Sequence, residues 1–223
     1  MIVAIDGPAA AGKSTVARAL AQRHGLAYLD TGAMYRAIAV EAMRRGIDVT
    51  DAPALAALAD QVSVTFEHES GSGLPTKVLV DGRDVTRDIR TPEADAAVSP
   101  VSAVAGVRAA LVEQQRRIAR IAEHTVLEGR DIGTVVFPNA DVKVFLTAST
   151  HERANRRTID MVDRGVAMTH DEVKVKLESR DSYDSTREAS PLACAADAFE
   201  LDTTGMSIDE VVDAIGALVE EKR

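Results

Sequence analysis

The hydrophobic and polar positions change their period several times within the first 46 residues. Ile2 to Asp6 is a nearly continuous apolar run that ends at a glycine, which is typical of a central parallel strand buried on both faces. Lys13 to His24 has apolar residues at helical spacing, and Gly25 is a stop signal. LAYLD (26–30) then predicts a strand and TGAMYRAIAVEAMRRG (31–46) a helix. Strand alternating with helix predicts a doubly wound α/β sheet.

Three later apolar runs extend this sheet. They are TVLEG (125–129), DVKVFL (141–146) and DAFELD (197–202), and long charged helical stretches lie between them. Together with the first two runs, they predict a parallel core sheet of five strands.

The segment 61–90 has a different pattern. VSVTFE (62–67) and KVLVDG (77–82) alternate apolar and polar positions, and the Gly, Ser and Pro residues of ESGSGLP (69–75) join them. This pattern predicts an antiparallel β-hairpin, which is foreign to a βα alternation.

We therefore expect the hairpin to belong to an insertion. The helical stretch 92–123 leads back to the core, so the insertion covers 61–123 and the core domain covers 1–60 and 124–223.

Composition narrows the classes of protein. The chain has 223 residues and is 46% hydrophobic, enough for a substantial core, and its formal net charge of −9 disfavours nucleic acid or an anionic membrane as the main partner. Cys194 is the single cysteine, so no intramolecular disulfide can form. No run reaches the roughly 18 apolar residues of a membrane span, and the N-terminus lacks a signal-peptide pattern. We expect a cytoplasmic protein, and a monomer because no long apolar helix face stands out.

The sequence GPAAAGKS fills the pattern G-x-x-x-x-G-K-[ST] between the first strand and the first helix. Backbone N–H groups of such a loop point at phosphate oxygens, the lysine neutralises phosphate charge, and Ser14 is the expected Mg²⁺ ligand. The pattern predicts a P-loop NTPase fold and an ATP or GTP site. The residues expected at this site are Gly7, Pro8, Ala9, Ala10, Ala11, Gly12, Lys13, Ser14 and Thr15.

Other motifs select among P-loop proteins. A GTPase would carry N-K-x-D, which is absent, and the D-x-x-G at 202–205 follows the last strand, too late for a switch loop. A motor or transporter would bring an apolar strand ending in D or DE, whereas the comparable strand here is TVLEGRD. These differences favour a small kinase.

Arginines favour the same class. Arg153, Arg156 and Arg157 share one helical face, which is either a solvated surface or a site for a polyanion, and their mutual repulsion favours the polyanion. In RDSYDSTR, the spacing of Arg180, Asp184 and Arg187 also places them on one face, although surface ion pairs explain that spacing equally well.

Polar residues also stand at the ends of two strands, the edge where open α/β sheets bind ligands. One set is Asp30, Thr31 and the nearby Arg36, and the other is Arg130 and Asp131. Helix capping by Thr31 and a structural salt bridge by Asp131 are simpler explanations for each set alone. Their occurrence beside a phosphate loop favours a second substrate site, and Asp30 could hold a Mg²⁺-bound water.

GPAAAGKST, LDTGAMYR, LEGRDIGTVVFP, ERANRR and RDSYDSTREASPLACAADA, in this order, resemble the bacterial cytidylate kinases over essentially the whole chain. One departure is Ala105 in SAVAGVR, where that family often has proline.

The resemblance implies Mg²⁺-dependent phosphotransfer from ATP to CMP or dCMP, a helical lid at about 150–168, and roles for individual residues. Residues in or near the acceptor phosphate region are Thr31, Arg36, Arg130 and Arg187, and Arg180 joins the substrate site. Ser99, Arg108 and Asp131 correspond to the cytosine readers, and Asp184 to a sugar contact. Arg153 and Arg157 belong to the lid over ATP, and with Lys13 and Arg187 they form the expected catalytic set.

The residue types agree with that substrate. A carboxylate such as Asp131 can accept from the cytosine amine, and Arg108 can donate to the ring, whereas uracil reverses the donor pattern. An unsatisfied buried group costs about 1 to 3 kcal/mol, which predicts a preference for CMP over UMP of roughly tenfold to a hundredfold. Two alternatives stay open. The chain could be a small P-loop kinase for UMP, dTMP or a metabolite such as shikimate, or an ATP-binding regulatory module without turnover.

Overall fold

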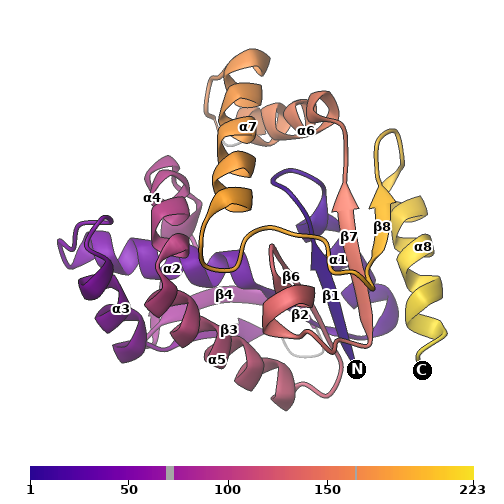
Figure 1. The fold of residues 1–223 in the computed structure, drawn as a ribbon, viewed down its shortest axis with the longest axis horizontal. Coiled ribbons are helices and arrows are strands. Elements are labelled where there is room, and N and C mark those ends of the chain that lie inside the picture. The colour runs from indigo at the N-terminus through magenta and orange to yellow at the C-terminus, as the bar shows by residue number, and fades with distance from the viewer. Residues whose placement is uncertain (69–72, 164) are drawn as a thin grey trace.

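The computed structural model of the chain describes residues 1–68, 73–163 and 165–223. Within these residues, five parallel strands form one sheet, as the sequence predicts, and their order is β2-β6-β1-β7-β8 (Figure 1). The strands are β1 (Ile2–Asp6), β2 (Ala27–Asp30), β6 (Thr125–Gly129), β7 (Val142–Thr147) and β8 (Phe199–Asp202).

The register of the sheet brings its polar strand ends together. Asp6 at the end of β1 lies opposite Gly129 of β6, and Asp30 at the end of β2 lies opposite Glu128 of β6. The segments that follow β1, β2 and β6 therefore leave the sheet side by side at its carboxyl edge, which is where a ligand site is expected in an open α/β sheet.

Helices cover both faces of the sheet. Side chains along β1 alternate between the two cores that result. Val3 and Ile5 pack with α1 (Lys13–His24) and α8 (Ile208–Glu220). Ala4 packs on the other face, in the core that contains α2 (Thr31–Arg44). The C-terminal helix α8 is absent from the sequence expectations; it begins at Ser207 with a capping box closed by Glu210.

The predicted hairpin is confirmed as an antiparallel pair, β3 (Val64–His68) with β4 (Pro75–Val80). A short third strand, β5 (Arg83–Asp84), adds to it. Of the predicted turn 69–75, residues 69–72 lie outside the described residues. The smaller sheet shares the large core that contains Ala4 and Leu29, and its strand β4 packs against α2. The division of the chain into 1–60, 61–123 and 124–223 stays a prediction.

The stretch 92–123 forms two helices rather than one. They are α4 (Pro92–Ala103) and α5 (Ala105–Ile121), and the chain bends by 97° between them. Val104, with φ −70° and ψ 116°, is extended and ends the first helix. Two further elements of this region are α3 (Ala52–Gln61) and the 3₁₀ turn Asp88–Arg90. Within the described residues, no single helix is long and apolar enough to cross a membrane. The bent pair α4–α5 reaches such a length and composition only when its two helices are counted together.

We expect Ala105→Pro to raise the free energy of unfolding by about 0.4 to 1 kcal/mol. Ala105 is exposed and is the first residue of α5, where proline fits because no intrahelical bond needs its N–H. The extended Val104 before it is the conformation that a following proline favours. Urea unfolding of the variant and the wild type checks this, and a loss of stability would contradict it.

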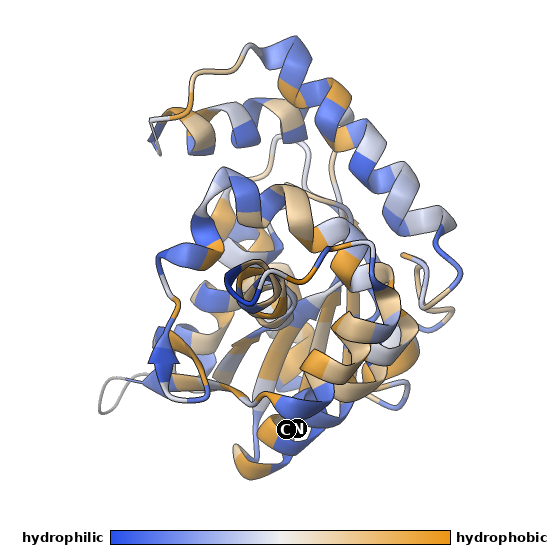
Figure 2. Cartoon of the chain, turned by 90° about the vertical axis from the view of Figure 1, so that its left-hand side faces the viewer, coloured by the Kyte–Doolittle hydropathy of each residue, from blue (hydrophilic) through white to orange (hydrophobic). Residues whose placement is uncertain are grey.

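Helices α6 (Thr150–Asp163) and α7 (His170–Thr186) lie beyond the carboxyl edge of the sheet, over the loop that follows β1 (Figure 1). Both are mostly hydrophilic, in contrast to the strands below them (Figure 2). A small separate core joins them to the loop, formed by Ala9, Ala154, Val173 and Leu177. The pair is therefore anchored at the phosphate loop rather than in the main cores.

Candidate functional site

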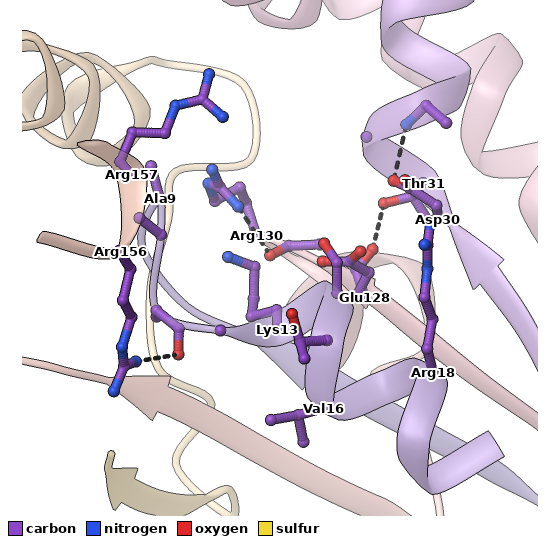
Figure 3. Close-up of a pocket in the computed structure, with 18 of the residues that line it drawn as sticks. Ala9, Lys13, Val16, Arg18, Asp30, Thr31, Glu128, Arg130, Arg156 and Arg157 are labelled. Carbon is purple, nitrogen blue, oxygen red and sulfur yellow. Dashed lines mark hydrogen bonds between the residues drawn. The ribbon is translucent and has the colours of Figure 1, made fainter. Parts of the chain in front are cut away.

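A cleft of about 1000 Å³ lies over the carboxyl edge of the sheet. The segment Ala9–Thr15, the start of α2, the end of β6, and both α6 and α7 line it. Figure 3 shows Lys13 pointing into the space between Arg130 and Glu128, with Arg156 and Arg157 on the opposite side from Asp30 and Thr31.

The glycines of the phosphate loop stand where its backbone needs a residue without a Cβ. Gly7 has φ +146°, and a Cβ there would lie 2.1 Å from the carbonyl oxygen of Leu146 in β7. Gly12, with φ +94°, precedes α1. Ala10, with φ +60°, adopts the left-handed conformation without being glycine. Gly7 and Pro8 lie behind the cleft, and the following residues line it.

Lys13 is 5% exposed, and its Nζ donates to the carbonyl of Pro8 at 2.7 Å. Burial lowers the pKa of Lys13, and the positive charge of Arg130 lowers it further. A bound anion would oppose this lowering of the pKa, because a nearby negative charge stabilises the charged ammonium. The ammonium is therefore placed to receive phosphate oxygens.

Glu128 is a cleft carboxylate that interacts with Ser14 of the loop, and sequence reasoning missed it. It is 5% exposed, its Oε1 accepts from the Tyr28 hydroxyl at 2.7 Å, and its backbone carbonyl accepts from Thr31 Oγ1 at 2.6 Å. Burial raises the pKa of Glu128, the charge of Asp30 adds to this rise, and Lys13 and Ser14 counteract it. The available signal was one acidic residue within the apolar run TVLEG.

The residues around Ser14 fit a Mg²⁺ ion. Mg²⁺ takes oxygen ligands, usually one or two protein groups together with substrate phosphates and water. The Ser14 hydroxyl and the Glu128 carboxylate are adjacent oxygen donors at the mouth of the phosphate loop. Asp30 is committed in part to another task, because its Oδ1 accepts from the N–H of Ala33 at 2.8 Å and caps α2. The helix cap is thus Asp30 rather than Thr31.

A buried ion pair stands at the far end of the cleft. Arg108 on α5 pairs with Asp131 after β6, and both are 4% exposed. Arg108 also donates to the carbonyl of Ser102 at 3.1 Å and lies over the ring of Tyr35 at 5.2 Å. Ser99, expected with this pair, does not line the cleft; its carbonyl accepts from Ser102 Oγ at 3.0 Å.

Asp6 fixes the turn that carries Asp131. Its two carboxylate oxygens accept from the N–H groups of Ile132 at 2.8 Å and Gly133 at 2.7 Å, the start of a π-helical turn (Ile132–Val136). Burial raises the pKa of Asp6 to about 6 against the lowering effect of these hydrogen bonds. The end of β1 therefore positions the residue that faces the second half of the cleft.

Asp184 joins two arginines from different segments. It is 3% exposed, accepts from Arg130 Nε at 2.9 Å and lies 3.7 Å from Arg187 Nη1. Arg187 follows the end of α7 in an extended conformation and donates through Nε to the carbonyl of Ser190 at 2.8 Å. Its Nη2 is buried without a hydrogen-bond partner among the described residues.

Arg180 also has a buried hydrogen-bond donor without a partner in the described part of the chain. It lines the cleft, and its Nε is buried without a hydrogen-bond partner among the residues described. Burial lowers the pKa of Arg180 to about 10, and the charges of Arg130 and Arg36 contribute. Two buried guanidiniums with free donors indicate a site for an anion with several oxygens.

Arg36 and Arg157 meet at one carboxylate. Arg36 Nε donates to Asp95 at 3.2 Å and Arg157 Nη2 donates to it at 2.8 Å. Burial would raise the pKa of Asp95, but the two arginines outweigh this and hold it below its usual value. Asp95 on α4 therefore connects the α2 side of the cleft with α6.

The three arginines of α6 differ in whether they reach the cleft. Arg156 and Arg157 line the cleft, whereas Arg153 does not; it is 7% exposed, and its Nη1 donates to the carbonyl of Ala9 in the phosphate loop at 3.2 Å. Arg156 donates to Thr203 Oγ1 at 3.0 Å and to the Thr203 carbonyl at 2.8 Å. Thr203 and Met206, after β8, also line the cleft and were not predicted.

The cleft concentrates positive charge in a chain whose net charge is −9. The basic residues that line it are Lys13, Arg18, Arg36, Arg90, Arg108, Arg130, Arg156, Arg157, Arg180 and Arg187. Such a cluster, beside backbone N–H groups at a helix N-terminus, favours a ligand with several phosphates.

Comparisons with known proteins agree with this chemistry. The chain is 49% identical to a cytidylate kinase of Limosilactobacillus fermentum over 98% of its length and 95% of the relative. It is also 49% identical to a cytidylate kinase of Desulforamulus reducens, over 98% of the chain and 96% of the relative. A crystal structure of an uncharacterized protein from Eubacterium ventriosum has a similar fold, with a TM-score of 0.52 and 12% identity over 99% of this chain and 98% of the other. The model of the cytidylate kinase family matches residues 3–221, and the chain therefore belongs to the cytidylate kinase family.

Proposed function

We propose that this chain transfers the γ-phosphoryl group of ATP to CMP or dCMP, giving ADP and CDP or dCDP. The observation that carries the proposal is a pair of arginines, Arg180 and Arg187, each with one buried N–H group that lacks a partner among the described residues, between the two ends of one cleft. The phosphate loop lies at one end and the Arg108–Asp131 pair at the other. Family membership supports both the reaction and the acceptor.

At the donor end, the loop N–H groups and Lys13 bind the β- and γ-phosphates of ATP. Arg156 and the residues after β8 lie beside the loop, where they enclose the nucleoside. Mg²⁺, held through Ser14 and Glu128, would screen the charge between the phosphates when bound. Asp30 acts as the α2 cap and stands at the edge of this half.

At the acceptor end, Asp131 accepts from the N4 amine of cytosine and Arg108 donates to its ring acceptors. Tyr35 lies under the guanidinium and keeps it oriented. Asp184 contacts the sugar, and the four arginines Arg36, Arg130, Arg180 and Arg187 bind the monophosphate. A ligand without the amine would leave the buried Asp131 carboxylate unsatisfied, which disfavours UMP.

Between the two ends, catalysis is positioning and charge neutralisation. The phosphate oxygen of CMP is already anionic near neutral pH, so no general base is required. Lys13, Arg157 and Arg180 would offset the charge that spreads over the transferred group. The helices α6 and α7 exclude water above it, which would limit ATP hydrolysis in the absence of CMP.

The test is ADP formation from ATP against CMP, dCMP, UMP, dTMP, AMP, GMP and no acceptor. We expect activity with CMP and dCMP at least tenfold above that with UMP, and little ADP without acceptor. Chelation of Mg²⁺ by EDTA should abolish the reaction, and added Mg²⁺ should restore it. ADP formation that does not depend on the acceptor would contradict the proposal, as would a preference for another monophosphate.

A further inference from the structure

One residue of the phosphate loop, Ala9, is held at both its N–H and its carbonyl by residues of the helices above it. The N–H of Ala9 donates to Asp181 Oδ1 at 3.1 Å, and the carbonyl of Ala9 accepts from Arg153 Nη1 at 3.2 Å. The same Arg153 Nη1 pairs with the second oxygen of Asp181. We call these three residues the Ala9 clasp.

The clasp joins parts of the chain that are distant in sequence. Arg153 comes from α6 and lies 144 residues from Ala9, and Asp181 comes from α7 and lies 172 residues from it. The Ala9 side chain is 6% exposed and packs in the small core with Ala154, Val173 and Leu177. Arg153 is fixed further, because its Nε donates to the carbonyl of Ala148 at 3.1 Å.

Neither charged member of the clasp lines the cleft. Sequence reasoning expects Arg153 above the ATP phosphates, but its guanidinium is committed to a backbone carbonyl and a carboxylate. The acceptor Asp181 takes up the Ala9 N–H, so this donor does not point at a ligand. The clasp can therefore influence ATP only through the shape of the loop.

That shape needs support at this point. The residue after Ala9 is Ala10, whose φ of +60° is disfavoured for a side chain with a Cβ. Such a conformation persists only where neighbouring contacts determine it. With Ala9 fixed on both sides, the following N–H groups stay directed at the cleft. Without the clasp, we expect Ala9 and Ala10 to relax into a loop that no longer surrounds a phosphate.

The clasp also connects the phosphate loop to both helices that carry cleft arginines. Asp181 directly follows Arg180 on α7, and Arg153 lies one turn before Arg156 and Arg157 on α6. Both helices are therefore tied to the phosphate loop at the level from which their arginines enter the cleft.

We propose that Asp181 is a positioning residue for the ATP phosphates, acting through Ala9 and Arg153. The inference rests on the proposed function for the identity of the nucleotide. It predicts a selective effect. Removal of the Asp181 carboxylate weakens the binding of ATP, whose phosphates the loop holds. It leaves CMP binding nearly unchanged, because acceptor residues other than Arg180 are held by pairs outside the clasp: Arg36 by Asp95, Arg108 by Asp131 and Arg130 by Asp184.

The experiment compares nucleotide binding and kinetics of the variants Asp181→Ala and Asp181→Asn with those of the wild type, all in the full-length chain. The readouts are the Kd of ATP without acceptor, the Kd of CMP without ATP, both by calorimetry, and the steady-state KM values. We expect Asp181→Ala to raise the Kd and KM of ATP at least tenfold, with the Kd of CMP within twofold of wild type. Asp181→Asn keeps an oxygen for the Ala9 N–H but loses the ion pair, so its ATP constants should rise about threefold to fivefold.

Glu178→Ala is the matched control, since Glu178 is an exposed carboxylate on the same helix, and all constants should stay at wild-type values. If Asp181→Ala does not fold, the ATP Kd of Asp181→Asn becomes the deciding measurement. An ATP Kd within twofold of wild type in the deciding variant overturns the proposal, even where kcat falls with the folded fraction. Because ATP binding is measured without acceptor, this result is independent of whether CMP proves to be the acceptor.

Discussion

Replacement of Lys13 by methionine should lower kcat/KM for the ATP-dependent phosphorylation of CMP by about 10³-fold. Lys13 is the buried cation of the phosphate loop, and Met has a similar length without the charge. The charge that develops on the transferred phosphoryl group would lose its nearest fixed counter-charge, in a site where burial makes such interactions strong.

The same change should not unfold the chain. Burial lowers the pKa of Lys13, which means that the folded state disfavours the charged lysine when no ligand is bound. We therefore expect the thermal midpoint of Lys13→Met at neutral pH to equal or exceed that of the wild type. Lys174→Met, an exposed lysine on α7, is the control and should keep full activity. A Lys13→Met enzyme with more than about a tenth of wild-type activity would remove the lysine from the catalytic account.

The second large effect is expected at Asp131, where Asn should lower kcat/KM for CMP by about 10²-fold. The carboxylate is 4% exposed and paired with Arg108, so asparagine leaves the arginine without its counter-charge and presents an amide N–H₂ toward the cytosine amine. Uracil has an acceptor at that position, so the loss for UMP should be smaller and the ratio of CMP to UMP activity should fall.

Steady-state kinetics with both acceptors checks this, together with the KM of ATP, which should stay within about threefold of wild type because Asp131 lies at the acceptor end of the cleft. Equal losses for CMP and UMP would show that Asp131 supports the fold of the site rather than the choice of base. A thermal melt separates that outcome from simple unfolding, since breaking a buried pair costs about 3 to 5 kcal/mol.

Periodicity and loop motifs were sufficient for the core of the fold. The five parallel strands and the antiparallel hairpin begin and end within two residues of the predicted runs, because strands buried on both faces and alternating strands leave distinct patterns. Helices α3 and α8 were not predicted, although both have local signals. Asp51 caps α3, and Ser207 with Glu210 forms the capping box of α8.

The candidate site was only partly visible in the sequence. Arginine spacing placed Arg156 and Arg157 on one helix, but spacing alone cannot show that Arg153 of the same set stays out of the cleft and pairs with Asp181. That distinction depends on where α7 packs, which is a tertiary property.

Contacts between distant segments were beyond sequence reasoning for the same reason. Asp95 lies 59 residues from Arg36 and 62 from Arg157, and nothing in the sequence around it marks it as their common partner. The sequence pattern identifies Asp6 only as the last residue of a strand, yet its two carboxylate oxygens accept hydrogen bonds from the turn after β6. Such residues become visible only when the register of the sheet is known.

The most direct test of the central claim is a competition experiment. The chain is incubated with ATP labelled at its γ-phosphate, Mg²⁺ and equal concentrations of CMP, UMP, AMP and GMP, and the labelled diphosphates are separated. Because the acceptors compete for one site, the label ratio gives the ratio of their kcat/KM values directly. The account predicts label in CDP at least tenfold above that in UDP and negligible label in ADP and GDP. Label spread evenly over the diphosphates, or concentrated in one other than CDP, would contradict it.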